Sequence, residues 1–160
     1  MHTWRVTRKS HAEQPLSGEG ARLHGGRWNH AGVAVVYTSQ SLSLAVLEYL
    51  VNVSPADLPD DLVSIQIQIP SELRRTEIPL SDLPEDWRIF PGREHLKDTG
   101  TDWALKASTP ILVVPSVVIP TELNYLINSK HRLVERIKIL SVEPFSLDAR
   151  FYQASKPSRK

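Results

Sequence analysis

The sequence predicts one domain that mixes β-strands and α-helices around a single buried core. Its 160 residues fit one domain, and the 41% hydrophobic and 23% charged fractions are those of an ordinary soluble globular protein. Twelve prolines favour many short elements joined by fixed turns over a helical bundle. Apolar runs of strand length recur among a few helical patterns, which is typical of a fold that contains both kinds of element.

Composition and charge exclude several classes of function. With a net charge of +1, nothing at this level indicates a nucleic-acid or acidic-membrane partner. The absence of cysteine excludes disulfides and thiolate zinc sites and fits a protein of the cytoplasm. The N-terminal residues lack the apolar core of a secretory signal, and no apolar run is long enough to cross a bilayer. We therefore expect a cytoplasmic protein.

The first element is expected to be a strand over residues 3–8. Its alternation places Trp4 and Val6 on one face and Arg5 on the other. A long polar segment, 9–32, follows without a clear period. Loops of this length in a compact domain are usually functional or form a flap.

A buried strand and an amphipathic helix come next. The nearly continuous apolar run 33–38 is typical of a strand that is covered on both faces. Ser39 or Ser41 can cap a helix over 42–53. This helix carries one carboxylate, Glu48, on or beside its apolar face.

Further strands are expected in the second half of the chain. Residues 62–69 alternate most cleanly, with one apolar face. A strand at 111–114 runs on to residue 119, and a final strand covers 136–142. Between these two strands, 121–132 is interpreted as a turn-rich loop.

Helical material is expected between the strands of the second half. Residues 85–90 predict either a short helix or a loop that packs through Trp87. The segment 93–108 has a helical composition, but Gly100 is expected to break it, with Asp102 as the cap of the second piece.

The block GGRWN at 25–29 is the first candidate for a binding site. Two adjacent glycines indicate a backbone that turns tightly or approaches a ligand closely. Arg27 can then bind an anion, and Trp28 can supply a face for stacking. The alternative is an ordinary hairpin loop that leads into a core strand.

Five further positions are candidates, and each has a plainer structural interpretation. Glu48 is either a helix-surface residue or a partly buried carboxylate that stabilises positive charge or orients a hydroxyl. Arg5 is either a solvated strand residue or an anion-binding partner. Tyr37 and Ser39 end a buried strand, where they either line a cleft or serve in packing and capping. Ser116 lacks a GxSxG elbow, so we expect it to hydrogen-bond a ligand and not to act as a nucleophile.

The well-known cofactor motifs are absent. The six histidines show no HExxH or paired metal spacing, so no metal site is expected. GxxxxGK[ST] and GxGxxG do not occur, which disfavours P-loop and Rossmann nucleotide binding. The residues by themselves therefore predict an α/β domain with a candidate anion-binding cleft.

Four blocks of the sequence resemble, in their order, those of one known family: WRV at 4–6, SGEGARLHGGRWNHAG at 17–32, VVYTSQSLSLAVLEYLV at 35–51 and VPSVVIPTELNYLINSKH at 114–131. The chain resembles the RES-domain toxins of bacterial toxin–antitoxin pairs, whose antitoxins are Xre-like. The Arg, Glu and Ser that give the family its name map onto Arg5, Glu48 and Ser116, with Arg27 as a rival for the Arg. One departure is Asn52, where members of the family often place a His.

The resemblance implies a RES domain over 1–154, followed by a short basic tail at 155–160. It implies an α+β fold similar to ADP-ribosyltransferases, with helices that flank a mixed β-sheet. It also implies cleavage of NAD+ at the nicotinamide–ribose bond by hydrolysis or phosphorolysis, with transfer of ADP-ribose to a protein as an alternative. NAD+ would then be a consumed substrate, and no cofactor is expected. A non-enzymatic or RNA-directed toxin module is a second alternative, although the basic residues are spread out.

The resemblance also implies a role for each candidate residue. Glu48 would stabilise the cation left on the ribose. Arg5 and Arg27 would hold the pyrophosphate through charge-assisted hydrogen bonds. The remaining candidates would stack on a ring or orient the amide and the ribose: Trp28, Tyr37, Ser39 and Ser116.

A partner protein follows from the same resemblance. A protein that drains NAD+ harms its own cell, so we expect a cognate Xre-like antitoxin that blocks the active site with a carboxylate against Arg5. A higher-order toxin–antitoxin complex is compatible with this expectation. Neither a membrane nor a nucleic acid is expected to bind this chain directly.

Overall fold

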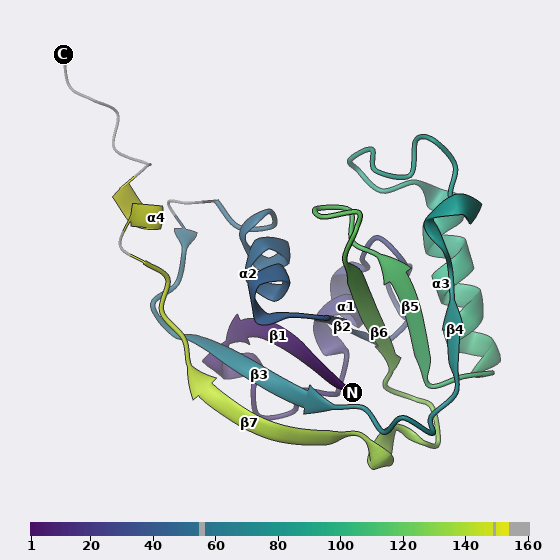
Figure 1. Ribbon diagram of the computed structural model, residues 1–160, viewed down its shortest axis with the longest axis horizontal. Coiled ribbons are helices and arrows are strands. Elements are labelled where there is room, and N and C mark those ends of the chain that lie inside the picture. Colours follow the sequence, from purple (N-terminus) through teal and green to yellow (C-terminus); the bar gives the residue numbers. More distant parts are fainter. Residues whose placement is uncertain (55–56, 149, 154–160) are drawn as a thin grey trace.

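The computed structural model describes residues 1–54, 57–148 and 150–153, and it contains a seven-stranded sheet with short flanking helices (Figure 1). The strands are β1 (His2–Arg8), β2 (Val35–Ser39), β3 (Leu62–Gln68), β4 (Arg75–Glu77), β5 (Ile111–Pro115), β6 (Leu123–Asn128) and β7 (Lys138–Pro144). Their order across the sheet is β4-β5-β6-β2-β1-β3-β7. Neighbouring strands are antiparallel except for β4 and β5, so the sheet is mixed. The expected α+β fold with a mixed sheet is confirmed.

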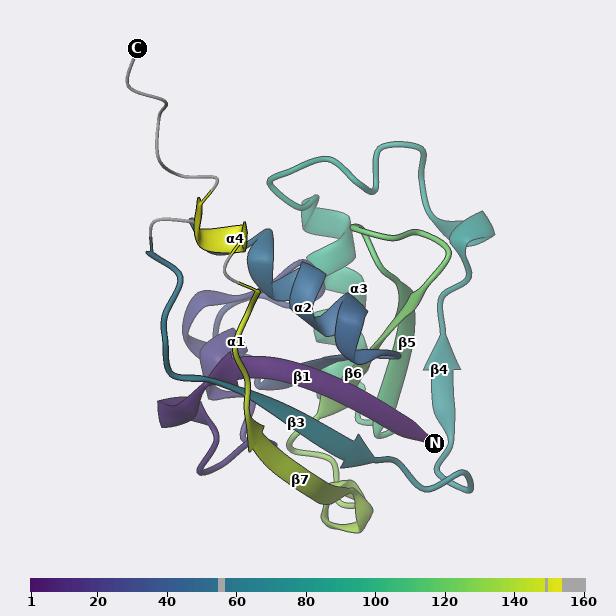
Figure 2. The same ribbon diagram turned by 60° about the vertical axis from the view of Figure 1, so that its left-hand side comes forward.

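The helices that the structure describes are α1 (Glu19–His24), α2 (Leu42–Leu50), α3 (Glu94–Lys106) and α4 (Arg150–Gln153). Figures 1 and 2 show α2 over β1, and α3 packs against β5 and β6. Of the two candidate caps, Ser41 caps α2, because its hydroxyl accepts a hydrogen bond from the Leu44 amide at 3.2 Å. Each described helix is too short or too polar to span a bilayer.

One face of the sheet carries the larger apolar core. It includes Ile65, Ile67 and Ile127, which are fully buried. Burial of an aliphatic side chain of this size contributes about 1.5–3 kcal/mol. The segment between β1 and α1 covers part of this face through Ala12 and Leu16. The long polar segment at 9–32 therefore also serves the core.

Two helices divide the opposite face of the sheet. On one half, Leu96 and Trp103 of α3 pack against Leu126 of β6. On the other half, Ala45 of α2 packs against Val6 of β1. A cleft lies between these two packed regions.

The sheet narrows where β1 and β2 meet. These strands pair at one position, Trp4 opposite Ser39. By contrast, β1 pairs with β3 along its whole length, and β2 does so with β6. The two halves of the sheet therefore diverge on either side of this junction, which leaves room for a site at the centre of the molecule.

The elements with strong periodicity are confirmed. The strands predicted at 3–8, 33–38, 62–69 and 136–142 and the helix predicted at 42–53 all exist, with ends that differ by at most three residues. Residues 85–90 were predicted to be either a short helix or a loop, and the structure shows a loop whose Trp87 is buried as expected.

Two predictions near the centre of the sheet are wrong. The segment 121–132 is not a loop, because it contains β6, which pairs with both β2 and β5. The strand that starts at residue 111 does not run on to 119 but ends at Pro115. The Ser116 hydroxyl then accepts hydrogen bonds from two backbone amides of the following residues, which turns the chain.

The predicted helix break at Gly100 is also wrong, since α3 continues through it. A Cβ at Gly100 would overlap the Trp28 carbonyl oxygen, so this glycine allows α3 to approach the 25–34 loop closely. The short elements α1 and β4 were not predicted. The predicted tail at 155–160 lies outside the described residues.

Candidate functional site

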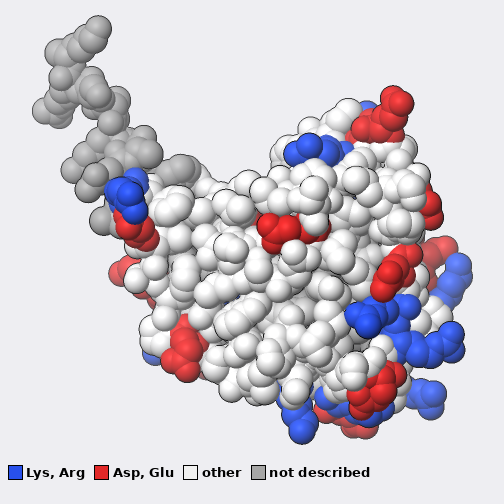
Figure 3. All heavy atoms as spheres, in the orientation of Figure 1, with Lys and Arg blue, Asp and Glu red and all other residues white. Residues whose placement is uncertain are grey.

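A cleft of about 1200 Å³ opens between α2 and α3. Segments 24–31, 90–92 and 117–118 form much of its wall, and Glu48 and Arg5 also line it. Figure 3 shows the surface dipping between α2 and the loop before α3, with Lys or Arg atoms on the loop side of the dip. Pockets for drug-sized ligands have volumes of roughly 300–1,000 Å³, so this cleft has room for a somewhat larger molecule.

Two donors hold one oxygen of the Glu48 carboxylate. The Ser116 hydroxyl donates a hydrogen bond to Glu48 Oε1 at 2.7 Å, and the Asn124 amide donates to the same oxygen at 2.6 Å. Both donors come from the β5–β6 hairpin, whereas Glu48 comes from α2. In the described part of the chain no group donates to the other oxygen, Oε2, which leaves it for a ligand.

The neighbours of these donors determine the direction of each hydrogen bond. Ser116 Oγ accepts from two backbone amides at 3.1 and 3.0 Å, so its single proton is directed to Glu48. Ser39 Oγ donates to Asn124 Oδ1 at 2.8 Å, which turns the Asn124 amide nitrogen toward Glu48. Ser116 is 0% exposed and Ser39 is also buried. Both serines therefore orient the carboxylate from behind it.

Arg5 lines the cleft as a half-buried cation. Its Nη1 donates to the Pro15 carbonyl oxygen at 3.1 Å, and it forms no ion pair with a carboxylate of the described residues. Burial lowers the pKa of Arg5, because the charged guanidinium loses hydration. A cation in this state gains strongly from an anionic ligand.

Arg27 stands on another wall of the cleft. Its Nη1 donates to the carbonyl oxygens of Trp87 and Ile89 at 2.8 and 3.2 Å. Burial lowers the pKa of Arg27, and the nearby Glu48 carboxylate partly offsets this effect. The structure thus brings both rival arginines, Arg5 and Arg27, to the same cleft.

Tyr37 and Asn29 shape the GGRWN block. The Tyr37 hydroxyl donates to Asn29 Oδ1 at 2.7 Å and accepts from the Trp28 amide at 3.0 Å. A Cβ on Gly26 would lie 2.6 Å from the Tyr37 hydroxyl, so the second glycine of the block is required. Burial raises the pKa of Tyr37, so its hydroxyl remains a donor.

Trp28 lies in the core beneath the cleft. It is 3% exposed and packs with Trp87, Leu96 and Trp103. Trp28 also lines the cleft, but these neighbours cover almost all of its ring, so packing is the role that the structure shows for it. The exposed aromatic side chain at the cleft is Phe90, which is 84% exposed.

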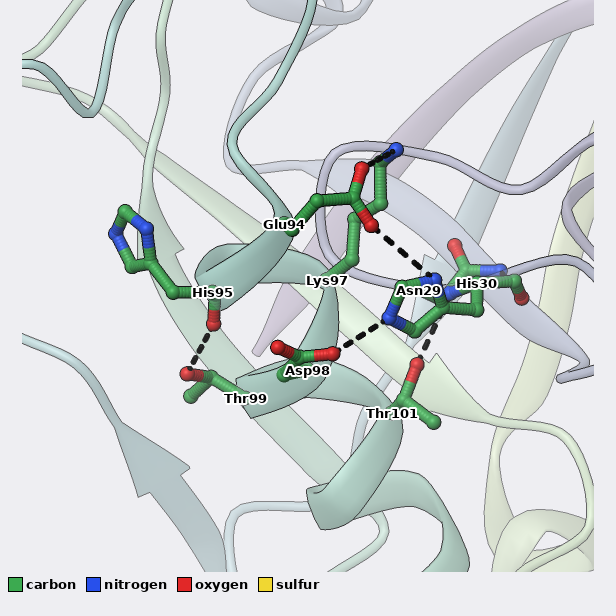
Figure 4. A network of polar contacts seen from close by, with 8 residues as sticks. All are labelled: Asn29, His30, Glu94, His95, Lys97, Asp98, Thr99 and Thr101. Atoms are coloured by element: carbon green, nitrogen blue, oxygen red, sulfur yellow. Dashed lines mark hydrogen bonds and ion pairs between the residues drawn. The ribbon is translucent and has the colours of Figure 1, made fainter.

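Polar contacts fasten the outer wall of the cleft to α3 (Figure 4). His30 Nε2 lies 2.7 Å from Asp98 Oδ1, and its backbone amide donates to Thr101 Oγ1 at 3.0 Å. Glu94 lies 3.9 Å from the other ring nitrogen of His30 and accepts a hydrogen bond from Lys97. His30 is therefore occupied in holding the wall. No three His, Asp or Glu side chains among the described residues are grouped to hold a metal ion.

The structure brings most of the predicted site residues together. Five of them line the cleft: Arg5, Arg27, Trp28, Tyr37 and Glu48. Asn124 was missed, because it lies in a segment interpreted as a loop. A signal existed, since residues 123–128 place Leu, Tyr, Leu and Ile around it, a composition typical of a short strand.

Comparison with known proteins gives concordant matches. A model of the RES domain matches residues 2–148. The Prs ADP-ribosylating toxin of Sphingobium sp. (strain YBL2) is 36% identical over 151 residues, which cover 92% of this chain and 94% of that protein. Toxin Res of Photorhabdus laumondii subsp. laumondii is 35% identical over 160 residues, which cover 98% of this chain and 100% of that protein.

A solved structure shares the fold. The M. tuberculosis MbcT–MbcA toxin–antitoxin complex contains a chain that superposes with a TM-score of 0.70, over 96% of this chain and 87% of that one. The sequence identity is 16%, so this likeness concerns the fold alone.

Proposed function

The chain belongs to the RES-domain family, and from this premise we propose that it is the toxin of a toxin–antitoxin pair and cleaves NAD+ between nicotinamide and ribose. Two relatives that it matches over almost their full length are named toxins, and one of these is named an ADP-ribosylating toxin. ADP-ribosylation takes its ADP-ribosyl group from NAD+, so this name supports NAD+ as the substrate. In this proposal NAD+ is consumed and does not act as a cofactor.

The observation that carries the proposal is the carboxylate of Glu48, held in a fixed orientation inside a cleft that two arginines also line. When the bond from ribose C1′ to the nicotinamide nitrogen breaks, the electron pair leaves with nicotinamide, and the ribose becomes an oxocarbenium-like cation. A carboxylate oriented in advance stabilises this charge without reorganisation. Its Oε2 is also available to accept a hydrogen bond from a ribose hydroxyl.

The pyrophosphate of NAD+ has two candidate partners in the cleft, Arg5 and Arg27. Each guanidinium carries five N–H donors, and the carbonyl contacts described above use only Nη1 in each residue. Donors therefore remain for phosphate oxygens, which a planar guanidinium binds well. Burial lowers the pKa of both side chains, which indicates that both cations are partly desolvated and would gain from this contact.

The acceptor of the ADP-ribosyl group is water or phosphate in our proposal, and a protein side chain is the alternative that the Sphingobium relative's name favours. Purified chain, free of antitoxin, should be incubated with NAD+, with and without phosphate, and the products resolved by mass spectrometry. Free nicotinamide with ADP-ribose indicates hydrolysis, and its phosphorylated form indicates phosphorolysis. Nicotinamide release that requires added cell lysate indicates transfer to a protein. Intact NAD+ in all three reactions contradicts the proposed function.

We further propose that an Xre-like antitoxin inactivates the chain by placing a carboxylate in the cleft against Arg5. The structural neighbour is a toxin–antitoxin complex, which supports a partner of this kind. Phe90 and Val51 line the cleft and are 84% and 61% exposed, which suits apolar side chains on either side of such a carboxylate. The antitoxin and ADP-ribose should therefore compete for the chain, and simultaneous binding of both would contradict this part of the proposal.

A further inference from the structure

β7 forms a free edge of the sheet. It is the last strand in the order across the sheet and pairs with β3 alone, and Figures 1 and 2 show it along the outer border of the molecule. It has seven residues, whereas β4 at the opposite edge has three. Two of its aliphatic side chains, Leu140 and Val142, are 45% and 41% exposed. An edge strand of this kind is a template for pairing with another strand.

The hydrogen bonds of the neighbouring strand β3 identify the backbone groups that β7 directs outward. Met1 and Ile69 exchange two backbone hydrogen bonds of 2.9 Å, so Ile69 and every second residue before it in β3 face β1. The residues between them face β7, in agreement with the hydrogen bond of 2.9 Å from the Phe145 amide to the Leu62 carbonyl oxygen. A residue of β7 that lies opposite a β3 residue facing β1 therefore has its own backbone groups directed outward.

Ile139 and Val142 are the residues of β7 in this position. They lie opposite Ile67 and Ile65, which both face β1. Leu140 is an extra residue at a β-bulge, so the two outward positions are separated by three residues and not by two. Among the described residues, no backbone hydrogen bond reaches β7 from its outer side. The edge thus carries two sets of free donors and acceptors at an unusual spacing.

From this edge we propose that β7 binds β7 of a second copy of the same chain, in antiparallel orientation, with Ile139 of each copy opposite Val142 of the other. A two-fold axis then relates the copies, and the same strand serves both sides of the contact. The two sheets continue into each other through the paired edges. This inference goes beyond the function proposed above and does not depend on it.

The side chains of β7 are complementary to one another in this register. Ile139 and Val142 lie on the face of the sheet that carries the larger core, because their β3 partners belong to that core. Lys138 and Glu143 lie on the other face, and Lys138 of one copy comes opposite Glu143 of the other. Within the described part of the chain neither of these charged residues has an ion-pair partner of its own. The symmetry repeats each pair, so two aliphatic and two opposite-charge pairs stabilise the contact.

The β-bulge favours a second copy over an ordinary strand. A regular strand directs its backbone groups to one side at every second residue, so it does not match Ile139 and Val142 at the same time. A second copy carries the same bulge, and the antiparallel orientation places its spacing of three residues against an equal spacing. Pro144 lies opposite Val63, and because it has no amide hydrogen, the pairing ends there in each copy.

The contact leaves the cleft open. β7 contributes no residue to the lining of the cleft, and β3 and β1 separate it from the junction of β1 with β2. Pairing through one strand buries less surface than a standard interface, so we expect a weak dimer with a Kd of roughly 1–100 µM.

Sedimentation velocity of purified, antitoxin-free chain tests the contact over a concentration series from about 1 to 200 µM, in which the wild type should pass from monomer to dimer. Lys138→Glu and Glu143→Lys each place like charges opposite one another at both ends of the contact, so the dimer Kd should rise about tenfold or more in either variant. An equimolar mixture of the two variants restores opposite charges at both ends. The mixture should therefore form mixed dimers with nearly the wild-type Kd, although neither variant associates well with itself.

Two further variants serve as control and second probe. Lys106→Glu makes the same change of charge on α3, which packs against the other half of the sheet, so it should dimerise like the wild type. Val142→Pro removes one outward amide hydrogen without removing a hydrogen bond to β3, so it should remain monomeric. A thermal melt checks that each variant is folded.

The proposal is overturned if the wild type stays monomeric throughout the series, if the single charge variants dimerise like the wild type, or if their mixture does not recover the dimer. Charge variants that instead lose affinity for the antitoxin would assign this edge to the antitoxin, which also overturns the proposal. None of these measurements uses NAD+, so a chain that fails to cleave NAD+ would remove the proposed function and leave this result unaffected.

Discussion

The Asn124 amide lies 2.6 Å from the same Glu48 oxygen that accepts the Ser116 proton, although Asn124 and Glu48 are 76 residues apart in the chain. The side-chain oxygen of Asn124, Oδ1, accepts a hydrogen bond from the Ser39 hydroxyl, so the side-chain amide is held in one of its two orientations. Three side chains thus orient one carboxylate, and Asn124 supplies the contact that depends on β6. The Glu48 carboxylate is therefore held in one orientation by residues from both sides of the cleft.

Replacing Asn124 with Asp should slow the reaction, because it turns a donor to Glu48 into a like charge. The variant puts a second carboxylate at hydrogen-bond distance from Glu48, and two negative charges at this distance repel each other. Glu48 then loses a donor and, with it, part of its fixed orientation. We expect nicotinamide release to fall about 10- to 100-fold.

Ser39→Ala is the companion to this variant. It removes the group that holds the Asn124 side-chain carbonyl oxygen but adds no charge, so the rate should fall by less. If folded Asn124→Asp releases nicotinamide at the wild-type rate, the contact of Asn124 with Glu48 does not contribute to the reaction.

Glu48→Gln should abolish most of the activity without loss of the fold. Gln keeps the size of the side chain but removes the negative charge that faces the developing cation, so nicotinamide release should fall about 100- to 1,000-fold. Glu122→Gln is the matched control, since Glu122 accepts hydrogen bonds from Gln40 and Ser41 and does not line the cleft. Its rate should remain close to wild type. A wild-type rate in Glu48→Gln would eliminate charge stabilisation by this residue.

Two helical glycines should respond in opposite ways to alanine. A Cβ at Gly100 overlaps the Trp28 carbonyl oxygen, so Gly100→Ala should lower the free energy of unfolding by about 1–3 kcal/mol or more. A Cβ at Gly20 in α1 meets nothing within 4 Å, so Gly20→Ala should stabilise by about 0.5–1 kcal/mol. Thermal or urea unfolding measures both values. Equal effects at the two positions would refute the close approach of α3 to Trp28.

The sequence predicted those elements whose hydrophobic pattern is visible within a single segment. Residues 62–69 alternate clearly, and β3 forms there. β6 was missed because its burial is imposed by β2 and β5, which arrive from distant parts of the chain. Gly100 was misinterpreted for a similar reason: the backbone that makes a glycine necessary there, at Trp28, is 72 residues earlier in the sequence.

The charged residues of the site were predictable from the sequence, but the residues that orient them were not. Glu48 stood out as a carboxylate beside an apolar helix face, and it lies in the cleft. Its donor Asn124 is visible only once the strands are placed in order. The burial of Trp28 was not predictable, because the sequence cannot show that Trp103 and Leu96 of α3 cover its ring.

Arg5 and Arg27, which the sequence could not rank, should be separable by replacement with lysine. Lysine keeps the charge but loses the planar fork that binds phosphate in a bidentate manner. Each variant should therefore weaken ADP-ribose binding about tenfold, as expected for loss of a hydrogen bond to a charged group. Arg8→Lys is the control: Arg8 lies on the same strand as Arg5 but forms an exposed ion pair with Asp61 outside the cleft, so ADP-ribose should bind it normally.

Arg5→Lys and Arg27→Lys should differ in their effect on the loop at residues 87–92. Arg27 Nη1 binds the carbonyl oxygens of Trp87 and Ile89, and an ammonium on a flexible stem does not reproduce that pair of contacts. Hydrogen exchange of the loop amides should therefore become faster in Arg27→Lys. It should match wild type in Arg5→Lys, because Arg5 contacts the Pro15 carbonyl oxygen and not this loop. Unchanged exchange in Arg27→Lys, together with weakened ADP-ribose binding, would make Arg27 a ligand contact alone. Faster exchange with normal ADP-ribose binding would make it a support of the cleft wall and leave the pyrophosphate to Arg5.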